Sequence, residues 1–494
     1  MSISSIKNHK QKSILYLTGS FCTLFLISSW FIPDLLKSKM GEWTVSSMEV
    51  FGGFYLWFGL AAVLVLILIA FSPIGSQRLG FESPEYGWFS WIAMLYSTGM
   101  GAGLLLRAVQ EPVFYYTHPP RDSIYSAGEF ALQYTFFHWG LTPWAFYGLF
   151  GLIISYNLYV RDSGILGSAI LPKKINNNVL GMGIDVLIII CTLLGVVAAV
   201  GLGSRQLLDA MAYWVGIENP DSRNAIYLLL SVCLLATVSA FLGVTKGIRV
   251  LSNLNIGMAS SLLLFTWLVG SEWAVVTSLF KSIGAYLWDF IPMSLNLGSK
   301  KVSESFLRDW TYFYWAFWLA WAPFTGVFIA RISRGRTVRQ FIIGVLLVPS
   351  LGTFIWFTVF GNNAFLLIET GQATVGQFES IYSGIFNFFT AFPYSNWSNA
   401  ITTILVFTFL ITSVDSAIFV LSMFSDGGKT EPNRLFRLFW GISISLFTTG
   451  VILIGKDQLL ESVSQMLILA ALPFSLMFCG MVICFVYRLY LQKK

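Results

Sequence analysis

Aromatic residues at regular spacing are the first candidates for chemistry in this chain. Trp315, Trp318 and Trp321 recur at three-residue intervals, and a second aromatic segment covers residues 138–147. A trimethylammonium group cannot donate a hydrogen bond, and proteins bind it through the faces of several aromatic rings. Aromatic residues of membrane proteins more often form interfacial belts or pack helices, but these tryptophans lie well inside apolar segments. Two interpretations therefore stand at this point, helix packing and recognition of a quaternary ammonium group.

Glycines are unusually dense in the apolar segment 91–111. Gly99, Gly101 and Gly103 occupy alternate positions, and each costs a helix interior about 1 kcal/mol relative to alanine. Unwound backbone is tolerated inside a membrane where it lines a cavity, and transporters place substrates and ions at such breaks. The alternative is close helix packing through the Gly-x-x-x-Gly pair at positions 99 and 103.

Oxygen ligands for a hard cation are available at two places. Thr412 and Ser413 bring adjacent hydroxyl groups into the apolar segment 407–416, and the glycine segment would free the backbone carbonyls of Ser97 and Met100. Hard cations take oxygen ligands of these kinds. The alternative is that the two hydroxyls bond back to the preceding helical turn, as is common in spanning helices.

A charged residue inside a predicted span is the main anomaly of the sequence. Arg107 is such a residue, and intramembrane charges are costly and usually functional. Glu111 lies one helical turn further on and could pair with it. The two interpretations are a structural Arg107–Glu111 pair and a role in the substrate path or gate. His138, next to Trp139, is predicted to be packed and hydrogen-bonded.

The composition predicts an integral membrane protein. The chain has 494 residues, of which 56% are apolar and 11% charged, and its mean hydropathy is +0.72. Soluble globular proteins carry about 25% charged residues. The formal net charge of +6 reflects basic loops and does not indicate nucleic-acid binding. The five cysteines lie in apolar runs without metal-ligand spacing.

Twelve apolar stretches could each form a spanning helix, which needs about 20 residues. They fall near 13–33, 51–73, 88–108, 131–158, 180–203, 224–243, 256–280, 311–331, 340–361, 399–423, 434–455 and 463–488. A shorter aromatic segment at 282–300 is predicted to be an interfacial helix. Lysine and arginine are more frequent in the loops on the side of the termini, which predicts that both termini are cytoplasmic.

These motifs together resemble the betaine/choline/carnitine transporter family. The resemblance rests on Gly99-Met-Gly-Ala-Gly103, the two aromatic segments and the Thr412-Ser413 pair. It implies an all-α membrane protein of twelve transmembrane helices with the LeuT-like fold, which has two five-helix inverted repeats. The chain would be a single transporter domain over 1–494, with two additional N-terminal helices in 1–75, the first repeat in 88–281, the interfacial helix in 282–300 and the second repeat in 308–490.

The resemblance also implies roles for individual residues. The substrate box would consist of Trp139, Trp144, Tyr147 and Trp318, with Trp315 and Trp321 flanking the pathway, Gly99, Gly101 and Gly103 on the substrate helix, and Phe324 and Phe328 as hydrophobic gates. Choline-specific relatives typically carry aspartate at the position of Gly103, so its absence argues against choline as the main substrate.

The family's sodium site has a complete counterpart here. It would comprise the carbonyls of Ser97, Met100 and Phe409 and the hydroxyls of Thr412 and Ser413. A second sodium site of some relatives needs hydroxyl residues that the segment 195–203 lacks, so one site is expected. Sodium-independent carnitine exchangers of the family place an arginine near the equivalent of Asn255, where this chain has asparagine.

The resemblance therefore implies a secondary active transporter, not an enzyme, that imports a betaine-like quaternary ammonium compound or related compatible solute by symport with Na⁺. The alternatives are a sodium-independent exchanger of the carnitine type and proton-coupled uptake. No cofactor is expected beyond Na⁺ as coupling ion. The expected partners are a small zwitterionic or quaternary ammonium substrate, the lipid bilayer of the cell inner (plasma) membrane and, as a homotrimer, two further copies of the chain.

Overall fold

The computed structural model describes residues 3–80, 83–99, 101–172, 176, 178–217, 220–243, 245–270 and 272–491. Within these ranges the protein is all-helical and has no β-strand. The sole bridge of β type in the described chain joins Arg78 to Thr337 between two loops. The all-α fold class is therefore confirmed.

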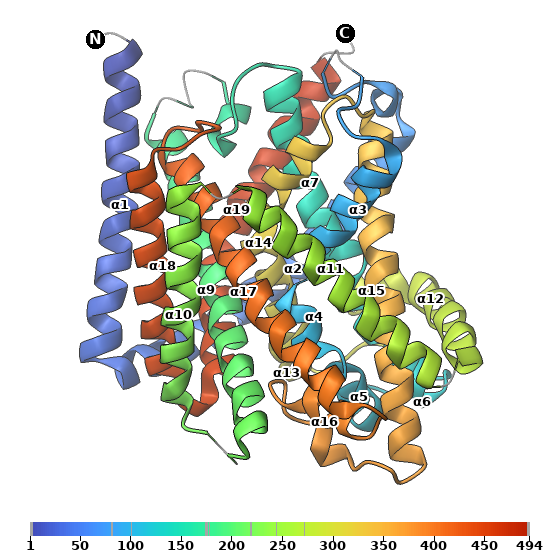
Figure 1. Cartoon of the computed structure of the whole chain (residues 1–494). Coiled ribbons are helices and arrows are strands. Elements are labelled where there is room, and N and C mark those ends of the chain that lie inside the picture. Colours follow the sequence, from blue (N-terminus) through green and yellow to red (C-terminus); the bar gives the residue numbers. More distant parts are fainter. Residues whose placement is uncertain are drawn as a thin grey trace.

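The helices follow one another along the chain with short connections (Figure 1). They are α1 (Ile3–Phe31), α2 (Pro33–Phe71), α3 (Trp88–Gly99), α4 (Ala102–Arg107), α5 (Gln110–Thr117), α6 (Ala127–Trp139), α7 (Leu141–Tyr159), α9 (Val179–Val215), α10 (Ala225–Leu242), α11 (Thr245–Val269), α12 (Glu272–Ser294), α13 (Glu304–Phe306), α14 (Phe313–Ile332), α15 (Val338–Glu369), α16 (Gly384–Thr390), α17 (Ser395–Ser425), α18 (Arg434–Gly455) and α19 (Leu459–Leu491). A π-helical turn, Leu307–Tyr312, leads into α14.

Nine segments of the described chain are long and apolar enough to cross a membrane. One of them, Arg434–Leu491, contains both α18 and α19. The predicted spans at 88–108 and 131–158 are not among the nine, and each of them is interrupted, at Gly99–Gly101 and at Gly140 respectively. The count of twelve spans and the inverted repeats remain predictions.

The region of the seventh predicted span differs from the expectation. One helix was expected at 256–280 and an interfacial helix at 282–300, but α11 ends at Val269 and α12 begins at Glu272. The boundary placed between 281 and 282 therefore cuts through α12. Residues 272–281 are apolar enough to extend the predicted span, but the chain turns before them at Gly270.

Helix α14 lies inside the bundle and packs against α7, α9 and α19 (Figure 1). Helix α1 lies at the edge of the bundle against α18, and both termini lie at the same end, at the top of Figure 1. The loop between α2 and α3 is at this end as well. The core that surrounds α14 consists largely of buried aromatic and aliphatic side chains.

Two glycines allow α7 and α14 to approach closely. A Cβ atom added at Gly326 would lie 2.9 Å from the backbone nitrogen of Gly151, and one added at Gly151 would lie 3.0 Å from the carbonyl oxygen of Gly326. Contacts this short between a Cβ atom and rigid backbone would force the helices apart. The glycine pair therefore sets the distance between the two helices that carry most of the aromatic residues described below.

We expect Gly326→Ala to destabilise the protein by about 1–3 kcal/mol, because the added methyl group has no space between α7 and α14. Gly480→Ala is the matched control, since a Cβ atom there meets nothing within 4 Å. Alanine in an open helical position should be neutral or slightly stabilising. The apparent melting temperature of the detergent-purified protein measures both, and equal temperatures for the two variants would contradict the packing argument.

Candidate functional site

A cavity of about 900 Å³ reaches from the middle of the bundle to the end that carries the termini. Its wall is built mainly by α7, α14 and α17, and parts of α3, α4, α6, α9, α10, α11, α15 and α18 complete it. The exposed side chains of Glu85, Arg331 and Arg334 line its mouth. The volume lies within the range of ligand sites in proteins. The cavity is therefore open toward the end of the termini.

Four aromatic side chains form a box at the inner end of this cavity. The ring of Trp318 lies 5.0 Å from that of Trp139 at 74° and 6.0 Å from that of Tyr147 at 83°. Trp144 meets Tyr147 at 5.3 Å and 88°. All four residues line the cavity. The structure thus brings together the four residues predicted for the box, from α6, α7 and α14.

Three of the four tryptophans that line the cavity direct their indole N–H groups into the protein. The indole N–H of Trp139 donates to Glu111 Oε2 at 3.0 Å, and that of Trp318 donates to the carbonyl oxygen of His138 at 2.9 Å. The indole of Trp321 donates to the carbonyl of Gly195 at 3.1 Å. Because the N–H groups are satisfied in the protein, the ring faces remain available to a ligand.

The predicted break in the glycine segment is confirmed. Helix α3 ends at Gly99, Gly101 has an extended backbone with φ −150° and ψ 177°, and α4 begins at Ala102. Gly101 and Gly103 line the cavity, and a Cβ atom at Gly103 would lie 3.5 Å from the ring of Trp139. Nothing lies within 4 Å of a Cβ atom at Gly101, so close helix packing does not explain that glycine.

The candidate ion ligands lie partly within the described residues. Phe409, Thr412 and Ser413 all line the cavity from α17. The hydroxyl of Thr412 donates to the carbonyls of Thr408 and Phe409, as the alternative of back-bonding predicts, while its oxygen lone pairs remain able to bind a cation. Met100 lies outside the described residues, and Ser97 is described as part of α3 by its backbone alone.

The chemistry of these ligands fits Na⁺. The hydroxyl oxygens and helix-end carbonyls are hard oxygen donors. Within the described ranges, no group of three or more histidine, cysteine or carboxylate side chains could hold a metal ion of another type. Asn255 of α11 also lines the cavity, and its side-chain oxygen accepts a 2.6 Å hydrogen bond from the hydroxyl of Thr408.

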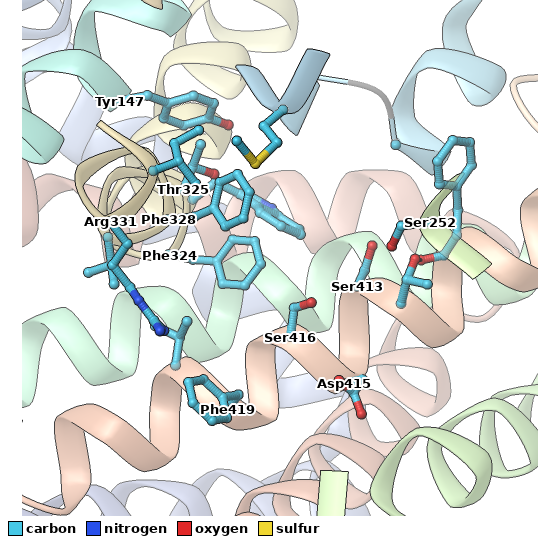
Figure 2. Close-up of a pocket in the computed structure, with 18 of the residues that line it drawn as sticks. Tyr147, Ser252, Phe324, Thr325, Phe328, Arg331, Ser413, Asp415, Ser416 and Phe419 are labelled. Atoms are coloured by element: carbon cyan, nitrogen blue, oxygen red, sulfur yellow. The ribbon is translucent and has the colours of Figure 1, made fainter. Parts of the chain in front are cut away.

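The candidate gate residues lie toward the mouth of the cavity. Phe324 and Phe328 both line it, one helical turn apart on α14, and Figure 2 shows them on the same side as Arg331. The side chain of Phe328 is 39% exposed, so it is accessible from the mouth of the cavity. Their role as gates stays a prediction.

The prediction that Trp315 flanks the pathway is wrong. Trp315 is fully buried beside Phe137 and against Gly59 of α2, and it does not line the cavity. Helical residues advance by about 100°, so residues six apart, such as Trp315 and Trp321, differ by about 120° in direction. Tryptophans at three-residue spacing therefore cannot all face one cavity.

A buried polar cluster behind the box was missed by sequence reasoning. Glu111 is fully buried and accepts hydrogen bonds from the indole of Trp139 and the hydroxyl of Tyr314, and its Oε1 lies 3.7 Å from Nδ1 of His138. His138 is itself bonded to Tyr115 at 2.9 Å and to Thr311 at 3.1 Å, which confirms its packed role. Glu111 thus supports a wall of the box.

The predicted Arg107–Glu111 pair is not formed. Arg107 donates to the side chain of Gln110 at 2.7 Å, and no carboxylate of the described chain lies within 4.0 Å of it. The physical reason is the end of α4 at Arg107, after which α5 begins at Gln110. Residues four apart share a helix face within a continuous helix, and the interruption removes that register.

Comparison with known proteins assigns the chain to a family. The model of the betaine/carnitine/choline family transporters matches residues 13–494. The chain belongs to this family. Its members are transporters, so the protein is a transporter and not an enzyme.

Individual relatives match over most of their length. The glycine betaine transporter OpuD of Bacillus subtilis (strain 168) is 36% identical over 460 residues, which are 91% of this chain and 89% of the relative. The high-affinity choline transport protein of Escherichia coli (strain K12) is 33% identical over 489 residues, 96% of this chain and 71% of the relative. Glycine betaine transporter 1 of Vibrio parahaemolyticus is 32% identical over 483 residues, which are 94% of this chain and 91% of the relative.

We expect Glu111→Leu to lower the free energy of unfolding by about 2–4 kcal/mol, because it leaves buried donors of Trp139 and Tyr314 without an acceptor. Glu111→Gln keeps one acceptor oxygen and should lose clearly less. Thermal unfolding of the purified protein compares the two variants. Equal losses would show that the carboxylate is not the acceptor that holds these side chains.

Proposed function

We propose that this transporter imports a betaine-like quaternary ammonium solute by secondary active transport. The observation that carries the proposal is the box of four ring systems at the inner end of the open cavity. A desolvated cation–π contact contributes about 2 kcal/mol, and several faces act on the same cation. Such a solute would serve osmoprotection when it accumulates in the cell.

The charge pattern around the box favours a zwitterion over choline. None of its four members is acidic, and position 103, next to Trp139, is glycine instead of aspartate. The carboxylate of Glu111 lies behind Trp139 and is engaged by its indole and by Tyr314. Relatives named for glycine betaine and for choline both match this chain, so the choice rests on these residues.

We also propose coupling to Na⁺ at the junction of the broken helix and α17. Na⁺ would supply a positive charge that holds the two elements together. Helix α4 packs against α17, and Thr412 and Ser413 face the cavity from the same part of α17. The carbonyls of Ser97 and Met100 would complete the site. Asn255, in place of the arginine of exchangers, brings no competing positive charge.

The orientation of the chain in the membrane decides on which side the cavity opens. We place both termini in the cytoplasm of a plasma-membrane protein, so the cavity of this structure opens inward. The opposite end, where Arg107, Trp310 and Tyr314 pack together, would then close the pathway toward the outside. The expected assembly is a homotrimer in which each copy carries its own pathway.

Replacement of a box residue tests the proposed substrate class. We expect Trp318→Ala to reduce uptake of radiolabelled glycine betaine by at least roughly tenfold, because the central ring of the box is lost. Trp57→Ala is the matched control, since that indole is 63% exposed on α2, away from the cavity. Membrane content is measured by immunoblotting. Normal uptake by a well-expressed Trp318→Ala protein would refute the box.

The ion site is tested by hydroxyl removal. Thr412→Ala and Ser413→Ala should each raise the Na⁺ concentration needed for half-maximal uptake by roughly tenfold, because each removes one ligand. Ser416→Ala serves as the control, because Ser416 also lines the cavity on α17 but does not belong to the proposed ligand set. The Na⁺ dependence of initial uptake rates is measured in proteoliposomes. A shift of equal size in all three variants would contradict the assignment.

A further inference from the structure

Arg107 is a buried cation outside the box, and the substrate and ion sites proposed above do not include it. Its side chain is 8% exposed, and its guanidinium lies 5.1 Å from the ring centre of Trp310 and 5.9 Å from that of Tyr314. A guanidinium carries five N–H donors. The hydrogen bond to Gln110 satisfies one of them, and no other partner lies within the described chain.

The acidic residue next to Arg107 does not neutralise it directly. Glu111 lies more than 4.0 Å away from Arg107. Its carboxylate instead accepts hydrogen bonds from Trp139 and Tyr314 and lies 3.7 Å from Nδ1 of His138. A buried charge without an ion-pair partner is energetically costly, and charges of this kind inside membrane proteins are usually functional. Aromatic faces hold the guanidinium in place and leave its planar donor edge free for an anion.

The position of Arg107 connects it to the box from the closed side. The ring of Tyr314 stacks on that of Trp318 at 6.1 Å, so one ring separates the guanidinium from the central ring of the box. Neither Arg107 nor Trp310 lines the cavity that opens at the other end. Trp310 belongs to the π-helical turn Leu307–Tyr312, and such turns are frequent at functional sites.

We propose that Arg107 is a carboxylate-binding site on the outer pathway that selects zwitterions over choline. The inference rests on the proposed function. When the outer end opens, separation of Trp310 and Tyr314 exposes the guanidinium to an arriving solute. The carboxylate of a betaine pairs with it in a bidentate manner before the ammonium group enters the box. Choline has no carboxylate and is repelled by the same charge.

The test measures uptake from the outside into intact cells that lack other carriers for these solutes. Radiolabelled glycine betaine gives KM and maximal rate, and unlabelled choline as competitor gives its inhibition constant. We expect Arg107→Gln to raise the KM for glycine betaine roughly tenfold or more, with no increase in the choline constant and a maximal rate within about threefold. Arg107→Lys keeps the positive charge but not the planar guanidinium, so its KM for glycine betaine should lie between those of the unaltered protein and of Arg107→Gln.

The matched control is Arg121→Gln. Arg121 also stacks on an aromatic ring, that of Phe130 at 4.8 Å, but it lies 3.8 Å from the carboxylate of Asp289 and outside the cavity. This variant should leave the ratio of the two constants unchanged. An unchanged ratio in Arg107→Gln, whether both constants rise or neither does, would overturn the inference.

Failure of the inference and failure of the proposed function give different results. If the unaltered protein takes up no glycine betaine, the proposed substrate is wrong. If it does, and the ratio is insensitive to Arg107, the box stands and the arginine is structural. Should Arg107→Gln be absent from the membrane, Arg107→Lys decides, because a rise of at least about threefold in the KM of glycine betaine alone is still expected.

Discussion

Three of the four indole N–H groups that line the cavity point into the protein, and the rest of the site depends on this. Trp139, Trp318 and Trp321 donate to a carboxylate and two backbone carbonyls, each on a different helix from the indole it holds. A buried N–H without a partner is costly, and in the cavity it would compete for the ligand. With these groups satisfied, the cavity is walled by ring faces, which bind a cation that has no hydrogen to donate.

Backbone geometry places these rings. The glycine pair at 151 and 326 lets α7 and α14 come close enough for Tyr147 and Trp318 to face one another. Gly101 and Gly103 add no side chain to the wall beside Trp139. The break after Gly99 also ends the regular hydrogen bonding of the helix there. Small residues thus provide the space, and the aromatic residues provide the binding surface.

Sequence alone predicted much of this arrangement. The helical segments, the break in the glycine segment and the four members of the box follow from composition, local cost and family resemblance, and the structure brings those residues together. Two predictions failed, each for its own reason. The role of Trp315 was taken from the family resemblance, and the angular drift of three-residue steps turns that side chain away from the cavity. The Arg107–Glu111 pair was placed by counting along a continuous helix, and the end of α4 at Arg107 removes that register. The cluster of Glu111, Trp139 and Tyr314 joins the consecutive helices α5 and α6 to the distant helix α14, and no local pattern signals it.

The central claim is that the cavity recognises positive charge through ring faces, and one comparison of ligands tests it most directly. Glycine betaine and 3,3-dimethylbutanoate have the same shape and carboxylate, but a carbon atom replaces the charged nitrogen in the second. Their affinities for the purified full-length protein are measured by tryptophan fluorescence at saturating Na⁺. The account predicts that the neutral-headed analogue binds at least roughly tenfold more weakly. Equal affinities would show that the box selects shape and hydrophobicity, and would contradict the account.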